Sequence, residues 1–120
     1  MPSAATTPRA AYRVGLIVPS SNTTMETEVP AILRAHEQVS QDRFTFHSAR
    51  VRMKHVTQAE LTAMDQNAAV AAVELADADV DVMGYACLVA TMSQGHGHHR
   101  FSEERLGKVA AEESGRETIK

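Results

Sequence analysis

Residues 85–92 have the sequence Tyr-Ala-Cys-Leu-Val-Ala-Thr-Met and follow an apolar run that begins at Val80. They contain Cys87, the one cysteine among the 120 residues. A short apolar run bounded by turn residues is typical of a buried strand, so we predict that the thiol lies on a turn just beyond a strand. A second turn, Pro-Ser-Ser-Asn-Thr-Thr at 19–24, follows an earlier apolar run in the same way. Function depends on whether these two turns meet.

Length and composition narrow the class of protein. A chain of 120 residues is one domain, which we place at residues 12–120. Its net charge of −3, with acids and bases mixed, indicates neither a nucleic-acid nor a membrane partner. A lone cysteine fits a reducing compartment, so we predict a cytoplasmic protein. Residues 1–11 lack the apolar segment of a secretory signal and are predicted to be a flexible leader.

The first apolar run, residues 13–18, predicts a strand that is covered on both faces. A helix should follow, with Thr23 and Glu26 at the spacing of a capping box. Pro30 is unfavourable in a helix interior, so the helix either kinks there or begins near Thr27. Its buried face is predicted to hold Met25, Val29, Ile32, Leu33 and His36.

The middle of the chain predicts a second strand and a long helix. Residues 44–51 alternate between apolar and polar side chains, which indicates an edge strand with one wetter face. Thr57 and Glu60 form a second capping-box pattern, and we expect a helix over 58–77. Its predicted buried stripe is Leu61, Met64, Ala68, Ala72 and Leu75.

The last part predicts a third strand at 80–86, a loop at 93–100 and a helix at 103–113. Ser102 should cap this helix and Gly115 should end it. Strands that alternate with helices predict an α/β fold with a parallel sheet. The two most apolar strands should be central, giving the order 2-1-3 in a three-stranded sheet flanked by helices. The chain stops where a fourth strand would be expected, so we predict an incomplete half of a larger fold.

In this strand order a switch point lies between the first and third strands, and ligands of open α/β sheets bind at such points. Asn22 and Cys87 should therefore lie within reach of one small ligand. A thiolate is a good nucleophile, an amide can donate to a carboxylate, and N–H groups after Cys87 would favour anions. The alternatives are that Cys87 is a small buried apolar residue and that 19–24 is an ordinary helix entry.

Two further clusters raise other possibilities. His96, His98 and His99 lie in a glycine-rich stretch, but no neighbouring residues complete a structural zinc pattern. We therefore predict a mobile loop and no metal site. The basic run of Arg50, Arg52 and Lys54 is expected to be a solvated strand end, although it could attract a dianionic substrate or pair with another subunit.

Three segments of the sequence resemble bacterial maleate cis-trans isomerases of the aspartate/glutamate racemase superfamily. The segments are residues 14–26 (Val-Gly-Leu-Ile-Val-Pro-Ser-Ser-Asn-Thr-Thr-Met-Glu), 84–90 (Gly-Tyr-Ala-Cys-Leu-Val-Ala) and 50–57. The resemblance runs from about residue 12 to 113. It implies a cofactor-free enzyme that converts maleate to fumarate, often in nicotinate degradation. It also implies two similar α/β halves with the active site between them.

By position, the resemblance makes Cys87 the nucleophile that forms a covalent succinyl-cysteine. Asn22 matches a residue that holds a substrate carboxylate, and Leu88 and Val89 match residues whose backbone amides do so. The second cysteine of the family has no counterpart here, so we expect an N-terminal half that acts on a small dicarboxylate and forms a homo-oligomer. The alternatives are an amino-acid racemase, an arylmalonate decarboxylase, or a non-catalytic half-domain that acts only by association.

Overall fold

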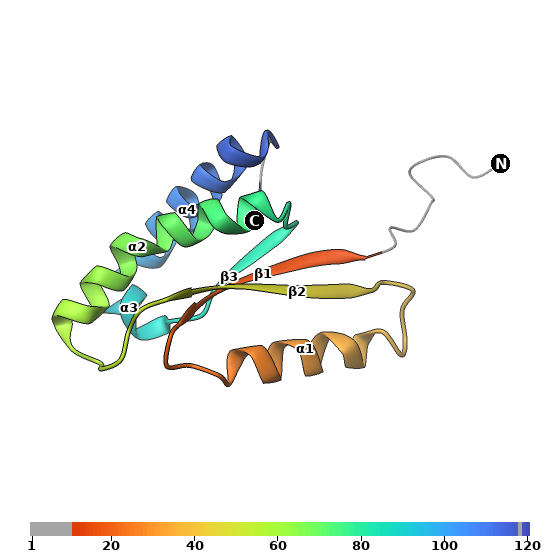
Figure 1. Ribbon diagram of the computed structural model, residues 1–120, viewed down its shortest axis with the longest axis horizontal. Coiled ribbons are helices and arrows are strands. Elements are labelled where there is room, and N and C mark those ends of the chain that lie inside the picture. The colour runs from red at the N-terminus through yellow and green to blue at the C-terminus, as the bar shows by residue number, and fades with distance from the viewer. Residues whose placement is uncertain (1–10, 118) are drawn as a thin grey trace.

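The computed structural model describes residues 11–117, 119 and 120. The predicted leader, apart from its last residue, lies outside the described residues. The elements follow in the order β1 (Tyr12–Pro19), α1 (Met25–His36), β2 (Phe44–Val51), α2 (Gln58–Asp77), β3 (Val82–Tyr85), α3 (Leu88–Met92) and α4 (His98–Ser114) (Figure 1). No helix in this part of the chain has both the length and the apolar character needed to cross a membrane.

The three strands form one parallel sheet in the predicted order, β2-β1-β3. β1 pairs with β2 along its whole length, from Tyr12 opposite Phe44 to Pro19 opposite Val51. On its other edge, β1 pairs with β3 from Val14 to Ile17. β1 is therefore the central strand, and the predicted α/β class is confirmed.

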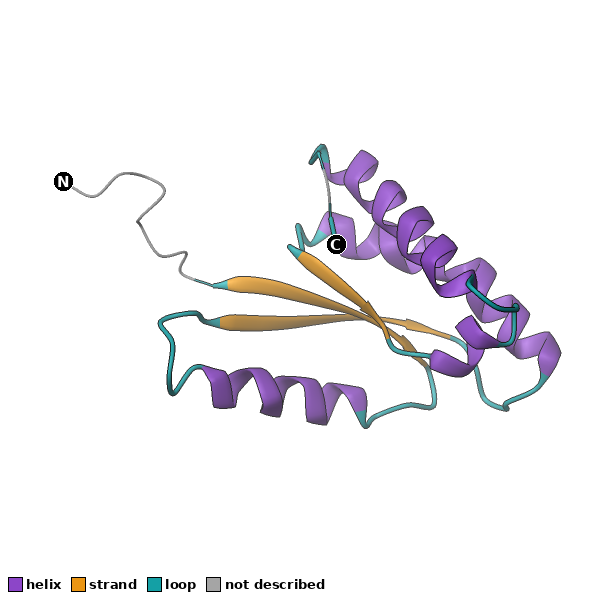
Figure 2. Ribbon diagram, turned by 180° about the vertical axis from the view of Figure 1, so that it is seen from behind, coloured by secondary structure: helices purple, strands orange, loops and turns teal. Residues whose placement is uncertain are grey.

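Helices cover both faces of the sheet: α1 lies on one side, and α2, α3 and α4 lie on the other (Figures 1 and 2). The side chains of β1 are shared between two cores. Leu16 and its neighbours two residues away pack towards α1, whereas Ile17 packs with residues of α2 and α4. Two covered faces explain why the run is continuously apolar rather than alternating.

The prediction for α2 is confirmed at both ends. Thr57 Oγ1 accepts a hydrogen bond from the N–H of Glu60 at 3.2 Å, which is half of a capping box. The Glu60 carboxylate does not return the bond to Thr57. It accepts instead from the N–H groups of Lys54 and His55, at 2.8 and 3.0 Å. All members of the predicted stripe are buried: Leu61, Met64, Ala68, Ala72 and Leu75.

α1 excludes one of two alternatives and corrects one prediction. It begins at Met25 and keeps Pro30 inside, so the alternative of a helix that begins near Thr27 is wrong. The predicted buried face is also too wide, because Ile32 is 68% exposed and His36 is exposed as well. Only Met25, Val29 and Leu33 pack against the core. These three recur every four residues and so face the sheet along one side of the helix.

The last third of the chain differs most from the prediction. β3 has four residues, shorter than the predicted 80–86, and α3 was not predicted. α4 begins at His98 rather than after Ser102, which lies buried within the helix. Gly95 and Gly97 have φ angles of 114° and 82°, a backbone region that favours glycine and makes the tight turn before α4 possible. Gly115 ends α4 with φ 72°, as predicted.

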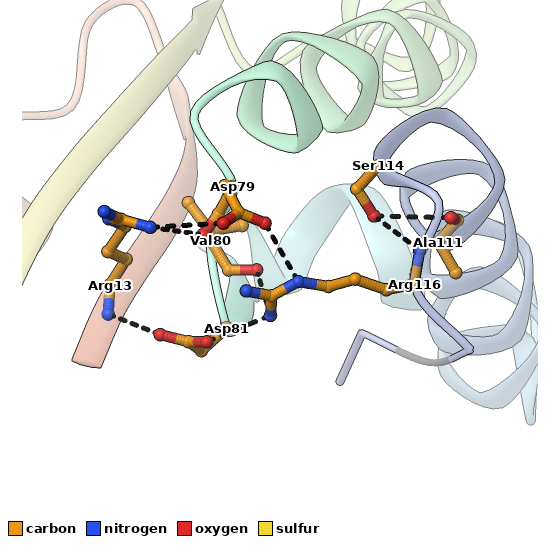
Figure 3. Close-up of polar contacts among 7 residues, drawn as sticks. All are labelled: Arg13, Asp79, Val80, Asp81, Ala111, Ser114 and Arg116. Atoms are coloured by element: carbon orange, nitrogen blue, oxygen red, sulfur yellow. Dashed lines mark hydrogen bonds and ion pairs between the residues drawn. The ribbon is translucent and has the colours of Figure 1, made fainter. Parts of the chain in front are cut away.

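A network of charged side chains joins the residues just after α4 to those just before β3 (Figure 3). The guanidinium of Arg116 bonds to Asp79 and to Asp81, both at 2.9 Å, and to the carbonyl of Val80 at 3.1 Å. Arg13 joins from β1, since its N–H donates to Asp81 at 2.8 Å. Hydrogen bonds to these two carboxylates, that of Asp81 first, raise the pKa of Arg116. These contacts lie at the amino ends of the strands and leave the carboxyl ends free.

The two isoleucines provide a matched test of the fold. Ile17 is 0% exposed and Ile32 is 68% exposed. We expect Ile17→Ala to lower the free energy of unfolding by about 2–5 kcal/mol, because it leaves a cavity in the core. Ile32→Ala should change it by less than about 0.5 kcal/mol. Urea unfolding of both variants measures the difference, and equal losses would contradict the assignment of faces.

Candidate active site

The turn after β1 is held by its own serine side chains. Ser21 Oγ donates to the carbonyl of Met53 at 2.7 Å, and the N–H of Met53 donates to Ser20 Oγ at 3.0 Å. The N–H of Ser20 also bonds to the carbonyl of Val51 at 2.7 Å. The two serines therefore tie the turn to the segment that follows β2, and their hydroxyl groups have structural partners.

Arg50 braces the same turn from β2. Its Nη2 donates to the carbonyls of Ser20 and Asn22 at 2.8 and 2.7 Å, and its Nη1 forms an ion pair with Glu26. Hydrogen bonding to Ser48, and then to Arg50, lowers the pKa of Glu26 below its ordinary value of 4.5. Arg50, Arg52 and Lys54 are all exposed, as expected of a solvated strand end, but the contacts that Arg50 makes with the turn were not predicted.

Asn22 caps α1 in place of the predicted capping box. Its Oδ1 accepts a hydrogen bond from the N–H of Met25 at 3.1 Å, whereas the side chain of Thr24, at the N-cap position, makes no such bond. Because an N–H group requires an acceptor, this contact fixes which amide atom is the oxygen. The Nδ2 group has no hydrogen-bond partner among the described residues. It provides two N–H donors next to a neutral, rigidly held turn.

Cys87 lies immediately before α3 and is 8% exposed. Its carbonyl accepts from the N–H and the hydroxyl of Thr91, each at 3.3 Å. The N–H groups of Leu88, Val89 and Ala90 precede this first helical bond, so they have no partner within the helix. A thiol and N–H groups without partners in the helix are therefore next to one another in the chain after β3.

The two turns meet at one end of the sheet, where the loops after β1 and β3 emerge (Figure 2). An open pocket of about 400 Å³ is lined by both turns, including Asn22, Cys87, Leu88 and Val89. This volume is within the range of small-molecule sites. The structure brings together all four residues named from the sequence, whereas their roles in binding and reaction stay predictions. Chemically, the site offers a nucleophile beside neutral N–H donors that suit carboxylates.

The predicted loop is shorter than expected, because His96 lies in it whereas His98 and His99 belong to α4. His98 is the first residue of α4, and its Nε2 lies 3.1 Å from Oδ2 of Asp65. His96 and His99 are exposed. Within the residues that the structure describes, no group of three or more His, Cys, Asp or Glu side chains is placed to hold a metal ion.

Sequence analysis missed the group around Asp65, in which Tyr85 and His98 also take part. These residues are far apart in sequence, and only Tyr85 lies in one of the segments that resemble the family. One signal was available: Asp65 lies four residues after Leu61, at the margin of the apolar stripe of α2. A carboxylate at such a position needs a partner when it is buried.

Comparisons with known proteins agree on one family of relatives. No protein-family model matches the chain. The maleate isomerase of Pseudomonas putida KT2440 is 60% identical over 101 residues, which cover 84% of this chain and 40% of that protein. Among solved structures, a variant of the maleate isomerase Iso from Pseudomonas putida S16 with maleate has 60% identity and a TM-score of 0.86, covering 91% of this chain and 44% of that one.

A further solved structure is a mutant of the maleate cis-trans isomerase of Nocardia farcinica with a covalently bound succinylcysteine intermediate. It is 40% identical and has a TM-score of 0.81. The match covers 91% of this chain and 43% of that one. The chain thus spans about 40% of the length of the relatives it matches and is similar to their N-terminal half.

The brace between Glu26 and Arg50 predicts a pH dependence. Because the pKa of Glu26 is lowered in the folded state, its contribution to stability is present above pH 4.5 and is lost as the pH falls through the folded-state pKa. We expect Glu26→Gln to lower the free energy of unfolding at pH 7 and to have little effect at about pH 3. Glu28→Gln removes an exposed carboxylate from the same helical turn and is the matched control. Equal effects of both variants at both pH values would contradict the brace.

Proposed function

We propose that this chain, which is similar to the N-terminal half of maleate isomerases, supplies the nucleophile for a cofactor-independent isomerisation of maleate to fumarate. The observation that carries the proposal is the pocket in which Cys87 and Asn22 lie together. The relatives indicate the substrate, since a similar solved structure is named for its succinylcysteine intermediate. We further propose a cytoplasmic reaction in nicotinate degradation, which rests on the lone cysteine and the family resemblance.

Binding in this proposal uses neutral donors at two places. Nδ2 of Asn22 donates to one carboxylate of maleate, and the free N–H groups of Leu88 and Val89 donate to the other. Arg50 takes no part, because its guanidinium is occupied by the turn and by Glu26. The dicarboxylate would lie across the carboxyl ends of β1 and β3, with its double bond beside the sulfur.

The reaction needs no redox partner. The Cys87 thiolate adds to one alkene carbon of maleate, and the neighbouring carbon takes up a proton, so that a succinyl thioether with a central single bond forms. Rotation about this bond exchanges cis for trans. The carbon that was protonated then loses a proton as the carbon–sulfur bond breaks. This restores the double bond and releases fumarate and the thiolate.

We propose that a group outside the present sequence donates the proton in this cycle. Cys87 is its one cysteine, and the family resemblance assigns the proton transfer to a second cysteine in the other half. General acid–base catalysis typically contributes about 10²–10⁴-fold. The chain alone is therefore proposed to form the covalent adduct more readily than it turns over.

Incubation with maleate tests the proposal. We expect intact-mass spectrometry to show an adduct of one maleate on the chain, and Cys87→Ser to abolish it. Proton NMR of the same samples reports any fumarate. Asn22→Asp keeps an oxygen for the N–H of Met25 but replaces the donor with a negative charge, and should slow adduct formation by about 100-fold.

Asn67→Asp makes the same change at an exposed position of α2 and serves as the control. An adduct that persists in Cys87→Ser, or none with the native cysteine, would refute the nucleophile. Equal rates in the two aspartate variants would refute the role of Asn22.

A second proposed role, self-association, rests on the surface of α3. Although this helix has five residues, it exposes the large apolar side chains of Leu88, Val89 and Met92. Contiguous exposed apolar side chains mark interaction surfaces. We propose that this face pairs with a second copy of the chain, which would also exclude water from the neighbouring pocket.

Size-exclusion chromatography with light scattering tests this association. Met92→Glu places a charge in the apolar face, and we expect it to raise the dissociation constant of the dimer by at least about tenfold. Val39→Glu is the control, because Val39 is 84% exposed and follows α1, away from α3. A wild-type protein that is monomeric at high concentration would contradict the proposal.

A further inference from the structure

Asp65 is a buried carboxylate on the apolar side of α2. It is 9% exposed, and its neighbours Met64 and Ala68 are 0% exposed. A charged group in such surroundings is costly unless its oxygens are paired. The partners of Asp65 therefore indicate what holds this part of the fold in place.

Both carboxylate oxygens have partners from outside α2. The hydroxyl of Tyr85 donates to Oδ1 at 3.4 Å, and His98 Nε2 lies 3.1 Å from Oδ2. Arg105 adds a hydrogen bond of 3.0 Å to the main-chain carbonyl of Asp65, and its guanidinium lies 3.7 Å from Oδ2. Burial, and then the charge of Asp65, raise the pKa of Tyr85 above its ordinary value, so the phenol remains a donor.

The positions of these partners in the chain show which segment the contacts of Asp65 constrain. Tyr85 is the last residue of β3, and His98 is the first residue of α4. Everything between them, residues 86–97, forms the segment that carries Cys87 and α3. One carboxylate thus binds the residue before this segment and the residue after it.

Few hydrogen bonds hold the segment to the rest of the described structure, although Cys87 and Ala90 pack into the core. Ala86 donates to the carbonyl of Ile17 at 2.8 Å. Beyond Ala86, the hydrogen bonds within this described segment run between near neighbours, such as Ser93 N–H to the carbonyl of Val89 and Gly95 N–H to that of Met92. The amide nitrogen of Gln94 is buried without a hydrogen-bond partner among the described residues. The segment is therefore fixed mainly at its ends and by apolar packing.

We propose that Asp65 is a positioning residue, whose carboxylate anchors both ends of the 86–97 segment and so sets the place of Cys87 and of the α3 N–H groups in the pocket. Its importance for turnover rests on the proposed function, whereas the anchoring itself does not. Asp65 does not line the pocket, and it acts through Tyr85 and His98.

Hydrogen exchange by mass spectrometry, measured without maleate, tests the anchor. In Asp65→Asn and Asp65→Ala, we expect exchange in the 86–97 segment to be about tenfold faster, with β1 and the rest of α2 unchanged. Alkylation of Cys87 by iodoacetamide should accelerate by a similar factor. Glu74→Gln removes an exposed carboxylate from the same helix and should change neither.

The contribution of Tyr85 is tested separately by Tyr85→Phe, which removes the hydroxyl and keeps the ring. This variant should loosen the segment in the native background and add nothing in the Asp65→Ala background, because the hydroxyl then has no partner. A purely structural effect of the ring would be the same in both backgrounds. Asp65→Asn and Tyr85→Phe are the mildest changes and keep the test available if Asp65→Ala does not fold.

Three results would overturn the proposal. One is exchange in the Asp65 variants that matches wild type, and another is exchange that rises equally in all elements, which would make Asp65 a general stabilising group. The third is an additive effect of Tyr85→Phe and Asp65→Ala. None of these depends on reaction with maleate, so failure of the anchor and failure of the proposed chemistry are told apart.

Discussion

The burial of β1 on both faces and along both edges is the constraint on which the other features depend. Its residues from Val14 to Pro19 are all buried, and the chain becomes exposed again at Ser20, where the turn begins. At Gly15 the fit is so close that a Cβ atom would lie 3.1 Å from Leu75 and 3.2 Å from Val80. Because the strand cannot shift, the turn after it leaves the sheet at one fixed point. The crossovers through α1 and α2 lie on opposite faces, so β3 ends beside that point.

Most polar groups of the turn after β1 are bonded to other parts of the fold, and few remain available to a ligand. The hydroxyl groups of Ser20 and Ser21 bind the segment after β2, and Arg50 holds the carbonyls of the turn. Even Asn22 uses its oxygen to cap α1. What is left for a ligand is the amide nitrogen of Asn22, a residue that lines the same pocket as Leu88 and Val89 at the start of α3. The donors that the proposed binding uses are thus ones that the fold does not occupy.

Sequence patterns predicted those elements in which local preference and packing in the fold favour the same structure. β2 and α2 have the predicted bounds because alternation, the cap at Thr57 and the apolar stripe all agree. The strand order and the meeting of the two turns followed from the same patterns. α3 was not predicted, because five residues are too few to show a helical period of apolar side chains. The early start of α4 depends on glycine turns and on the contact of His98 with Asp65, and Arg50 and Asp65 act through partners distant in sequence. Such contacts leave no local signal.

The position of the cysteine segment depends on charge as well as on burial, and α4 shows why. Of the four residues that α4 buries, Leu106 is the one large apolar side chain; the others are Ser102, Ala110 and Ala111. Apolar burial alone gives such a helix a weak hold on its place. Its two ends are held by charged groups instead, by Asp65 near His98 and by Asp79 and Asp81 at Arg116. Since buried polar contacts have narrow geometry, they fix α4 along its axis, and with it the point where the segment after Cys87 must end.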